Sequence, residues 1–186
     1  MKMSCDDVER VKKIEFVKQH VRSYPDFPKK GILFRDIFSV FNDVEATRTL
    51  DCLIADHVKN LQKPIDAVIG LESRGFLFGP QIASILGVPF VPARKKGKLP
   101  GELIRLEYSL EYGTDVMEVQ KESLAGKKSV LIVDDLLATG GTMKAAVDLA
   151  TSTGANVVEC FVILELADLK GRDKIPVPCH SLIVYD

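Results

Sequence analysis

The spacing of hydrophobic and polar positions predicts a chain in which strands and helices alternate. Apolar residues at helical spacing predict helices over about 6–21, 45–61, 76–86 and 142–153. Short apolar runs predict strands at 67–71, 90–91, 130–133, 157–166 and 182–185. Such alternation is typical of βαβ units. The pattern therefore predicts an α/β fold with a doubly wound, mainly parallel sheet, in which ligands bind at the carboxyl ends of strands.

Two segments do not fit this alternation. Between residues 103 and 119 apolar and polar side chains alternate around the turn Gly113-Thr114, which predicts a β-hairpin with one covered face. The first 40 residues also stand outside the βαβ pattern. We expect a single domain over residues 1–186, with a small hood at 1–40 and a flexible hairpin flap at 99–120.

The segment from Val130 to Thr142 combines a strand, two acids and a glycine-containing loop that opens a helix. Backbone N–H groups at a helix N-terminus, approached closely through glycines, form an anion site. Asp134 and Asp135 would repel a phosphate unless they accept hydrogen bonds from sugar hydroxyls or hold a cation. The combination favours a ribose phosphate over a plain strand–turn–helix. Neither a Walker A loop nor a G-x-G-x-x-G motif is present in it.

Two further segments carry candidate chemistry after predicted strands. Glu72-Ser73-Arg74-Gly75 offers backbone N–H groups, a hydroxyl and a guanidinium, although Ser and Gly also serve simply as helix caps. Arg94-Lys95-Lys96-Gly97-Lys98 is either a solvated loop or a site for pyrophosphate. Because the carboxyl ends of parallel strands meet at one edge, we expect both segments to converge with Asp134–Thr142 in one crevice.

Composition excludes several classes of function. The 186 residues are 46% hydrophobic with a net charge of −1, which fits one compact core and argues against a general nucleic-acid partner. The four cysteines lack the spacing of a metal knuckle or a redox pair, and the three histidines are scattered. No apolar run suggests a membrane span and no signal peptide is recognisable, so a cytoplasmic location is expected.

Six segments, in this order, resemble the adenine-specific family of type I phosphoribosyltransferases. The resemblance extends over almost the whole chain and rests on Tyr24–Pro28, Gly31–Ile37, Gly70–Gly79, Arg94–Gly101, Tyr108–Gly113 and Val133–Thr142. The resemblance implies transfer of the phosphoribosyl group from phosphoribosyl pyrophosphate (PRPP) to adenine, giving AMP and pyrophosphate. It also implies Mg²⁺ held mainly by substrate and water, and a cytoplasmic homodimer that binds neither nucleic acid nor membranes.

The resemblance assigns roles to residues by position. The 5′-phosphate would be bound by Ala138, Thr139, Gly140, Gly141 and Thr142, and the ribose hydroxyls would be bound by Asp134 and Asp135. Pyrophosphate would be bound by Glu72, Ser73, Arg74, Arg94, Lys95 and Lys98. The family often has a non-proline cis peptide in the pyrophosphate loop, and Glu72 stands where we associate the family with Asp. Adenine is assigned to Leu33, Phe34 and Arg35. Glu111 becomes the acid/base candidate on the flap, beside Tyr112.

Spacing alone leaves some roles open. Arg35 and Asp36 could equally form a structural ion pair, and Glu111 could be an ordinary surface carboxylate. Two other functions also remain open. One is the same transfer to hypoxanthine, guanine or xanthine. The other is a PRPP-sensing regulator that binds nucleic acid, which should carry a DNA-binding segment or a broad basic face.

Overall fold

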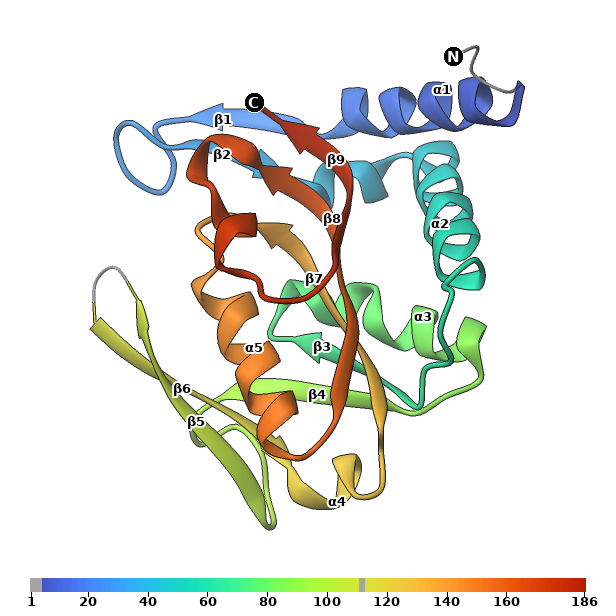
Figure 1. Cartoon of the computed structure of the whole chain (residues 1–186). Coiled ribbons are helices and arrows are strands. Elements are labelled where there is room, and N and C mark those ends of the chain that lie inside the picture. Colours follow the sequence, from blue (N-terminus) through green and yellow to red (C-terminus); the bar gives the residue numbers. More distant parts are fainter. Residues whose placement is uncertain (1–4, 111–112) are drawn as a thin grey trace. The chain divides into compact units, whose positions relative to one another are not determined.

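The computed structural model describes residues 5–110 and 113–186 (Figure 1). The chain divides into two compact units, Met1–Asn60 and Leu61–Asp186. Each unit has its own secondary structure and is described by itself. The first unit extends past residue 40 and includes the whole second helix.

The first unit contains two helices and a two-stranded sheet. Its elements are α1 (Cys5–His20), β1 (Arg22–Pro25), β2 (Leu33–Asp36), the 3-10 helix η1 (Ile37–Asn42) and α2 (Val44–Lys59). The apolar face predicted for the second helix is buried, and Leu50 and Ile54 are fully so. Asp43 caps α2 by accepting a hydrogen bond from the Ala46 N–H at 2.8 Å. Both predicted helices of this unit are confirmed.

The second unit is built on a seven-stranded sheet of order β5-β6-β4-β3-β7-β8-β9. The strands are β3 (Ala67–Leu71), β4 (Phe90–Lys95), β5 (Leu103–Leu110), β6 (Gly113–Gln120), β7 (Ser129–Leu137), β8 (Asn156–Leu166) and β9 (Cys179–Tyr185). From β4 to β9 neighbouring strands are parallel, and β5 and β6 form the predicted antiparallel hairpin. The mainly parallel sheet is confirmed. Helical elements complete the unit: η2 (Arg74–Leu77), α3 (Gly79–Leu86), α4 (Lys121–Leu124), α5 (Gly141–Ser152), η3 (Ala167–Leu169) and η4 (Gly171–Lys174).

The central strands are buried on both faces, as expected for a parallel sheet covered by helices. In β7, Val130 and Ile132 belong to the core cluster that includes the apolar face of α5, and the alternate residues Leu131 and Val133 are also fully buried. The helix α3 packs against β3 and β4. Continuous apolar runs in the sequence therefore reflect burial of both faces.

The hairpin is joined to the main sheet rather than separate from it. Strand β6 pairs with β4 at two positions only, Arg94 with Glu118 and Lys95 with Met117 (Figure 1). This joint connects the predicted flap to the strand that carries the basic segment.

Strand β7 is longer than the apolar run that predicted it. The run ends at Val133, but ladder pairing with β8 continues through Asp134 to Leu137, which lies opposite Glu165. The polar residues stay in the strand because the neighbouring strand supplies backbone partners there. Asp134 and Asp135 therefore lie within the end of the sheet, on a rigid element.

Candidate active site

A cavity of about 290 Å³ lies at the carboxyl ends of the parallel strands of the second unit. Its lining comes from the ends of β3, β4 and β7, from the hairpin and from the start of α5. The predicted convergence of the three loops is confirmed for this unit, since the lining includes Glu72, Ser73, Arg74, Arg94, Lys95, Asp134, Asp135 and Thr142.

The two acids at the end of β7 differ in their surroundings. Asp135 is 4% exposed and forms an ion pair with Arg74, whose Nε lies 3.0 Å from a carboxylate oxygen. Asp134 is half-buried and its Oδ1 accepts the Asp135 backbone N–H at 2.8 Å. Burial and the neighbouring charge of Asp135 raise the pKa of Asp134 well above its usual value. Burial also raises the pKa of Asp135, and Arg74 opposes that shift.

A second hollow of about 100 Å³ adjoins this cavity. It is lined by the loop Ala138–Thr142 and shares Asp134, Leu136 and Thr142 with the larger cavity. Gly140, the N-cap residue before α5, has the left-handed conformation with φ of 79°, which only glycine adopts without strain. The hollow lies at the N-terminus of a twelve-residue helix, where backbone N–H groups and the helix dipole favour an anion.

Glu72 forms part of the cavity wall through a bidentate ion pair. Its two carboxylate oxygens accept hydrogen bonds from Nε and Nη2 of Arg94, each at 3.0 Å, and one oxygen also accepts the Lys95 N–H at 3.1 Å. The bonds from Arg94 lower the pKa of Glu72 against the opposing effect of burial. The peptide bond between Glu72 and Ser73 is cis, as the resemblance implies.

Two hairpin residues in the cavity wall escaped sequence reasoning. Asp115 forms an ion pair with Lys95 at 3.1 Å. The Tyr108 hydroxyl interacts with Asp115 and with Thr142 of the phosphate loop, and burial, followed by the charge of Asp115, raises the pKa of Tyr108. These contacts join the hairpin to both halves of the cavity. The period-two pattern marked Tyr108 only as a covered side chain.

Glu118 was also missed, and it shapes the basic segment. It is fully buried, and its oxygens accept hydrogen bonds from the Lys98 N–H at 3.0 Å and from Nε of Arg105 at 3.0 Å. Burial raises its pKa, but the bonds from Arg105 and from backbone N–H groups outweigh that effect and lower it. A glutamate inside the apolar run Val116–Val119 was the available signal.

The residues assigned to the base belong to the first unit. Leu33, Phe34 and Arg35 form β2 of the first unit, where the Phe34 ring packs edge-on against Phe27 at 5.1 Å and Arg35 donates to the Ser23 hydroxyl at 2.6 Å. Asp36 caps η1 by accepting the Phe38 N–H. Glu111 and Tyr112 fall outside the described residues.

Over residues 5–110 and 113–186, no three His, Cys, Asp or Glu side chains are grouped as metal ligands. None of the helices in these same two ranges has both the length and the apolar character needed to cross a membrane.

The fold and the two adjoining hollows are typical of one class of protein, the phosphoribosyltransferases. Residues 42–183 match the model of the phosphoribosyl transferase domain, and the chain belongs to this family. Among curated relatives, adenine phosphoribosyltransferase of Caenorhabditis elegans is 53% identical over 171 residues, covering 91% of this chain and 92% of its own length.

Solved structures narrow the class to the adenine-specific branch. Adenine phosphoribosyltransferase of Saccharomyces cerevisiae, solved with adenine and an imino-altritol bisphosphate, superposes with a TM-score of 0.87 and 43% identity, covering 92% of this chain and 99% of its own. The enzyme of Trypanosoma brucei, solved with AMP, pyrophosphate and ribose 5-phosphate, has a TM-score of 0.82 and 34% identity, covering 97% and 81%. This chain groups with the adenine phosphoribosyltransferases.

Proposed function

We propose that this protein transfers the 5-phosphoribosyl group of PRPP to adenine, giving AMP and pyrophosphate for purine salvage. The observation that carries the proposal is the pair of adjoining hollows. One is a glycine loop at a helix N-terminus, the other is lined by paired charges, and Asp134 and Thr142 line both. A ribose phosphorylated at both ends has the same arrangement, with its sugar between two anions.

The smaller hollow takes the 5′-phosphate in this proposal. The N–H groups of Ala138–Thr142 bind the phosphate oxygens, and the carboxylates of Asp134 and Asp135 accept hydrogen bonds from the ribose hydroxyls. Hydroxyl donors would relieve the burial of these two acids. The assignment of both acids to the sugar is supported by Asp134, which lines both hollows, and by the adjacent Asp135, which lines the larger one.

The larger cavity takes the pyrophosphate. Arg74, Arg94 and Lys95 line it, and each already has a carboxylate partner: Asp135, Glu72 and Asp115 respectively. We assign Glu72, Ser73 and Lys98 to the same group, with Ser73 contributing its hydroxyl and backbone. As the bond to the anomeric carbon breaks, these cations stabilise the charge that accumulates on the leaving group.

Magnesium fits this site as a substrate-bound ion. The cavity offers carboxylate oxygens, which suit a hard cation, and PRPP would supply further oxygen ligands. When bound, Mg²⁺ would supply positive charge beside the pyrophosphate oxygens. The ion would be held mainly by PRPP and water, and Asp134, which is half-buried in the cavity wall, would face it without being a dedicated ligand.

Adenine binding and proton transfer are assigned to the first unit and to the hairpin flap. Leu33, Phe34 and Arg35 line the adenine pocket, and Glu111 exchanges a proton with the purine while Tyr112 covers it. The hairpin excludes water, because water would capture the oxocarbenium-like sugar. The units Met1–Asn60 and Leu61–Asp186 then act as one phosphoribosyltransferase domain, with a hood within 1–40 and a flap within 99–120.

We further propose a homodimer located in the cytoplasm. Three neighbouring apolar side chains of the first unit are exposed: Phe38 at 51%, Phe41 at 38% and Val44 at 66%. An exposed apolar group of this kind favours burial against a second copy. Light scattering after size-exclusion chromatography measures the mass directly, and a mass of one chain at micromolar concentration refutes the dimer.

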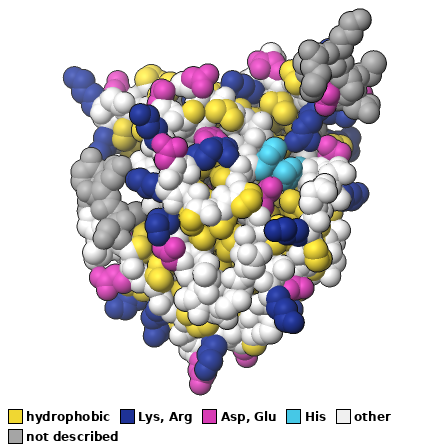
Figure 2. Space-filling view, in the orientation of Figure 1, with side chains coloured by type: hydrophobic (Ala, Val, Ile, Leu, Met, Phe, Trp, Pro, Cys, Tyr) yellow, Lys and Arg dark blue, Asp and Glu magenta, His cyan; other side chains and the backbone are white. Residues whose placement is uncertain are grey.

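One assay tests the reaction and separates it from its alternatives. Adenine, PRPP and Mg²⁺ should give AMP and pyrophosphate, while hypoxanthine, guanine and xanthine compete poorly. Preference for another base would move the protein to another branch of the family. The regulator alternative gains no support from the face drawn in Figure 2, where Lys and Arg lie interspersed with Asp and Glu. A salt-dependent gel shift without AMP formation would favour it.

A further inference from the structure

A turn far along the chain lies directly against the phosphate loop. Gly171, the first residue of η4, is buried, and a Cβ placed on it would lie 2.1 Å from the Ala138 carbonyl oxygen and 2.8 Å from the Gly140 nitrogen. Conversely, a Cβ on Gly140 would lie 2.3 Å from the Gly171 carbonyl oxygen. The two backbones are therefore in direct contact, with no side chain between them.

Space, rather than backbone conformation, requires the glycine at position 171. Gly140 has a positive φ, so a side chain there would be strained for two reasons. Gly171 does not have a positive φ, so its backbone conformation would accept a side chain. An alanine at 171 would have to move from 2.1 Å to at least 3.0 Å from the Ala138 oxygen, a displacement of about 0.9 Å. Either the turn or the phosphate loop must give way.

The next residue anchors this turn to the sheet. The Arg172 guanidinium forms a bidentate pair with Glu165, with Nε 3.0 Å from one oxygen, and it also donates to the Cys179 carbonyl oxygen and to the Ser181 hydroxyl. Glu165 is only 5% exposed and accepts a further bond from Ser181 at 2.5 Å. Two strands, β8 and β9, therefore hold one side chain of the turn.

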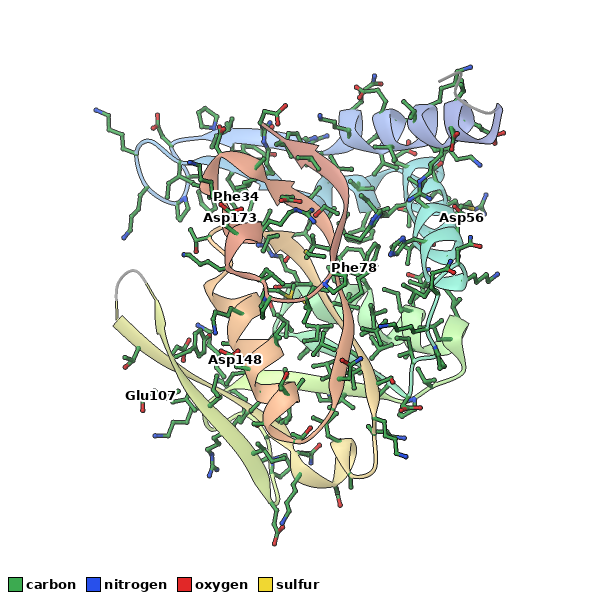
Figure 3. All side chains as sticks on the ribbon, viewed as in Figure 1. Phe34, Asp56, Phe78, Glu107, Asp148 and Asp173 are labelled. Carbon is green, nitrogen blue, oxygen red and sulfur yellow. The ribbon has the colours of Figure 1, made fainter. Side chains whose placement is uncertain are left out.

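The anchor lies next to the strand that leads into the phosphate loop. Glu165 of β8 is in register with Leu137 of β7, the residue immediately before Ala138. The chain leaving β7 is thus fixed by the sheet on one side and by the η4 backbone on the other. Figure 3 labels Asp173 in this turn. A loop that binds phosphate through backbone N–H groups depends on such support, because it has few side chains to hold it.

We propose that Gly171 and the Arg172–Glu165–Ser181 cluster are positioning residues for the 5′-phosphate. They fix the backbone of Ala138–Gly140 without touching the substrate. The inference rests on the proposed function in assigning this loop to the phosphate. A displacement of about 1 Å at a binding group is enough to cost roughly 100-fold in rate or affinity, so the cluster should control PRPP and AMP binding selectively.

The first test is Gly171→Ala, with Asp173→Ala as a matched control. Asp173 is exposed in the same turn, and its N–H bond to the Lys170 carbonyl does not need the side chain. For Gly171→Ala we expect the AMP dissociation constant and the KM for PRPP to rise about 10- to 100-fold. The KM for adenine and inhibition by free pyrophosphate should stay close to wild type, and the control should match wild type throughout.

A second pair of variants separates positioning from folding. Arg172→Met removes the bidentate pair and Arg172→Lys retains one donor, so the lysine variant should recover part of the AMP affinity. Thermal unfolding is measured on both. A lower melting temperature with wild-type AMP affinity would overturn the proposal, as would wild-type AMP affinity in Gly171→Ala.

The outcome is distinguishable from failure of the proposed function. If the wild-type protein forms no AMP from adenine and PRPP, the function is refuted. AMP binding by calorimetry still reports on the loop in that case. If the wild type is active and Gly171→Ala loses adenine and AMP binding equally, the selective positioning role is refuted while the function stands.

Discussion

Removal of Arg74 should destabilise the protein as well as weaken pyrophosphate binding. Asp135 is 4% exposed and Arg74 is its ion-pair partner at 3.0 Å. Arg74→Met keeps an apolar stem of similar reach but leaves the Asp135 carboxylate buried without its partner. Such a loss is costly, because the low-dielectric surroundings solvate a lone charge poorly.

The geometry sets the size of the effect. Breaking a fully buried pair on one side costs about 3–5 kcal/mol. The Arg74 side chain is 25% exposed, so water can reach part of the vacated space, and we expect about 2–3 kcal/mol, at or below the low end of that range. For a chain of this length that corresponds to about 5–10 °C in melting temperature.

The pH dependence gives the prediction a sign. Burial raises the pKa of Asp135 and Arg74 opposes it, so the variant should have the higher folded-state pKa. When a carboxyl has a higher pKa in the folded state than in the unfolded state, the folded protein loses stability as pH rises from the unfolded-state pKa through the folded-state pKa. The stability deficit of Arg74→Met should therefore be larger at pH 8 than at pH 5.

Thermal and urea unfolding at these two pH values, together with Asp135→Asn and the double variant, test the reasoning. In the Asp135→Asn background the further change Arg74→Met should cost little, because no buried charge is left unpaired. Equal costs in both backgrounds, or a deficit independent of pH, would refute the account. Product inhibition by pyrophosphate measures the functional loss separately.

Three other variants test the proposed site. Asp134→Asn should weaken PRPP binding yet stabilise the ligand-free protein by about 0.5–2 kcal/mol, and wild-type PRPP affinity would contradict the ribose assignment. Because burial raises the pKa of Asp134, the gain in stability should appear at pH 8 and vanish toward pH 4. Glu111→Gln should keep PRPP binding and lose turnover. The control is Glu107→Gln, which should leave both unchanged; Glu107 is exposed on β5 and labelled in Figure 3. Full turnover in Glu111→Gln would remove Glu111 from acid/base chemistry. Glu118→Gln should destabilise the protein by about 1–3 kcal/mol and weaken pyrophosphate inhibition. Because the pKa of Glu118 is lowered in the folded protein, the stability that Glu118 contributes is present above its unfolded-state pKa and lost as pH falls through its folded-state pKa. An acid-unfolding curve that is the same in the variant and the wild type would contradict this role of Glu118.

Local periodicity explains which parts of the fold could be predicted. Ala67–Leu71 was predicted with the bounds of β3, and the hairpin was recognised from strict alternation, because in both cases the pattern arises within the element itself. The end of β7 was missed because Asp134 and Asp135 interrupt the apolar run. Pairing with β8 keeps them in the strand, and a single sequence does not show which strand is the neighbour.

Contacts between distant segments explain what could not be predicted at the site. The sequence Lys170-Gly-Arg-Asp-Lys174 reads as a solvated loop, and nothing in it indicates a contact between Gly171 and Ala138. The sequence did not show the partner of Arg74 either, because Arg74 begins η2 and its partner Asp135 lies on β7, about 60 residues later. The composition of the loops indicated candidate anion sites, but it did not show the contacts that support these loops.

The pairing of charges in the cavity explains why its basic residues do not form a general anion surface. Arg74, Arg94 and Lys95 each lie within 3.1 Å of a carboxylate. The two arginine side chains are mostly buried, at 25% and 32% exposed, so they are positioned before any ligand arrives. Fixed cations lose little side-chain entropy on binding. A long polyanion would meet these carboxylates as well as the cations, and repulsion would offset much of the attraction. In the proposed function, a compact pyrophosphate would instead lie among the cations within the cavity. The same carboxylates would then both position the cations and restrict the anion to one that fits between them.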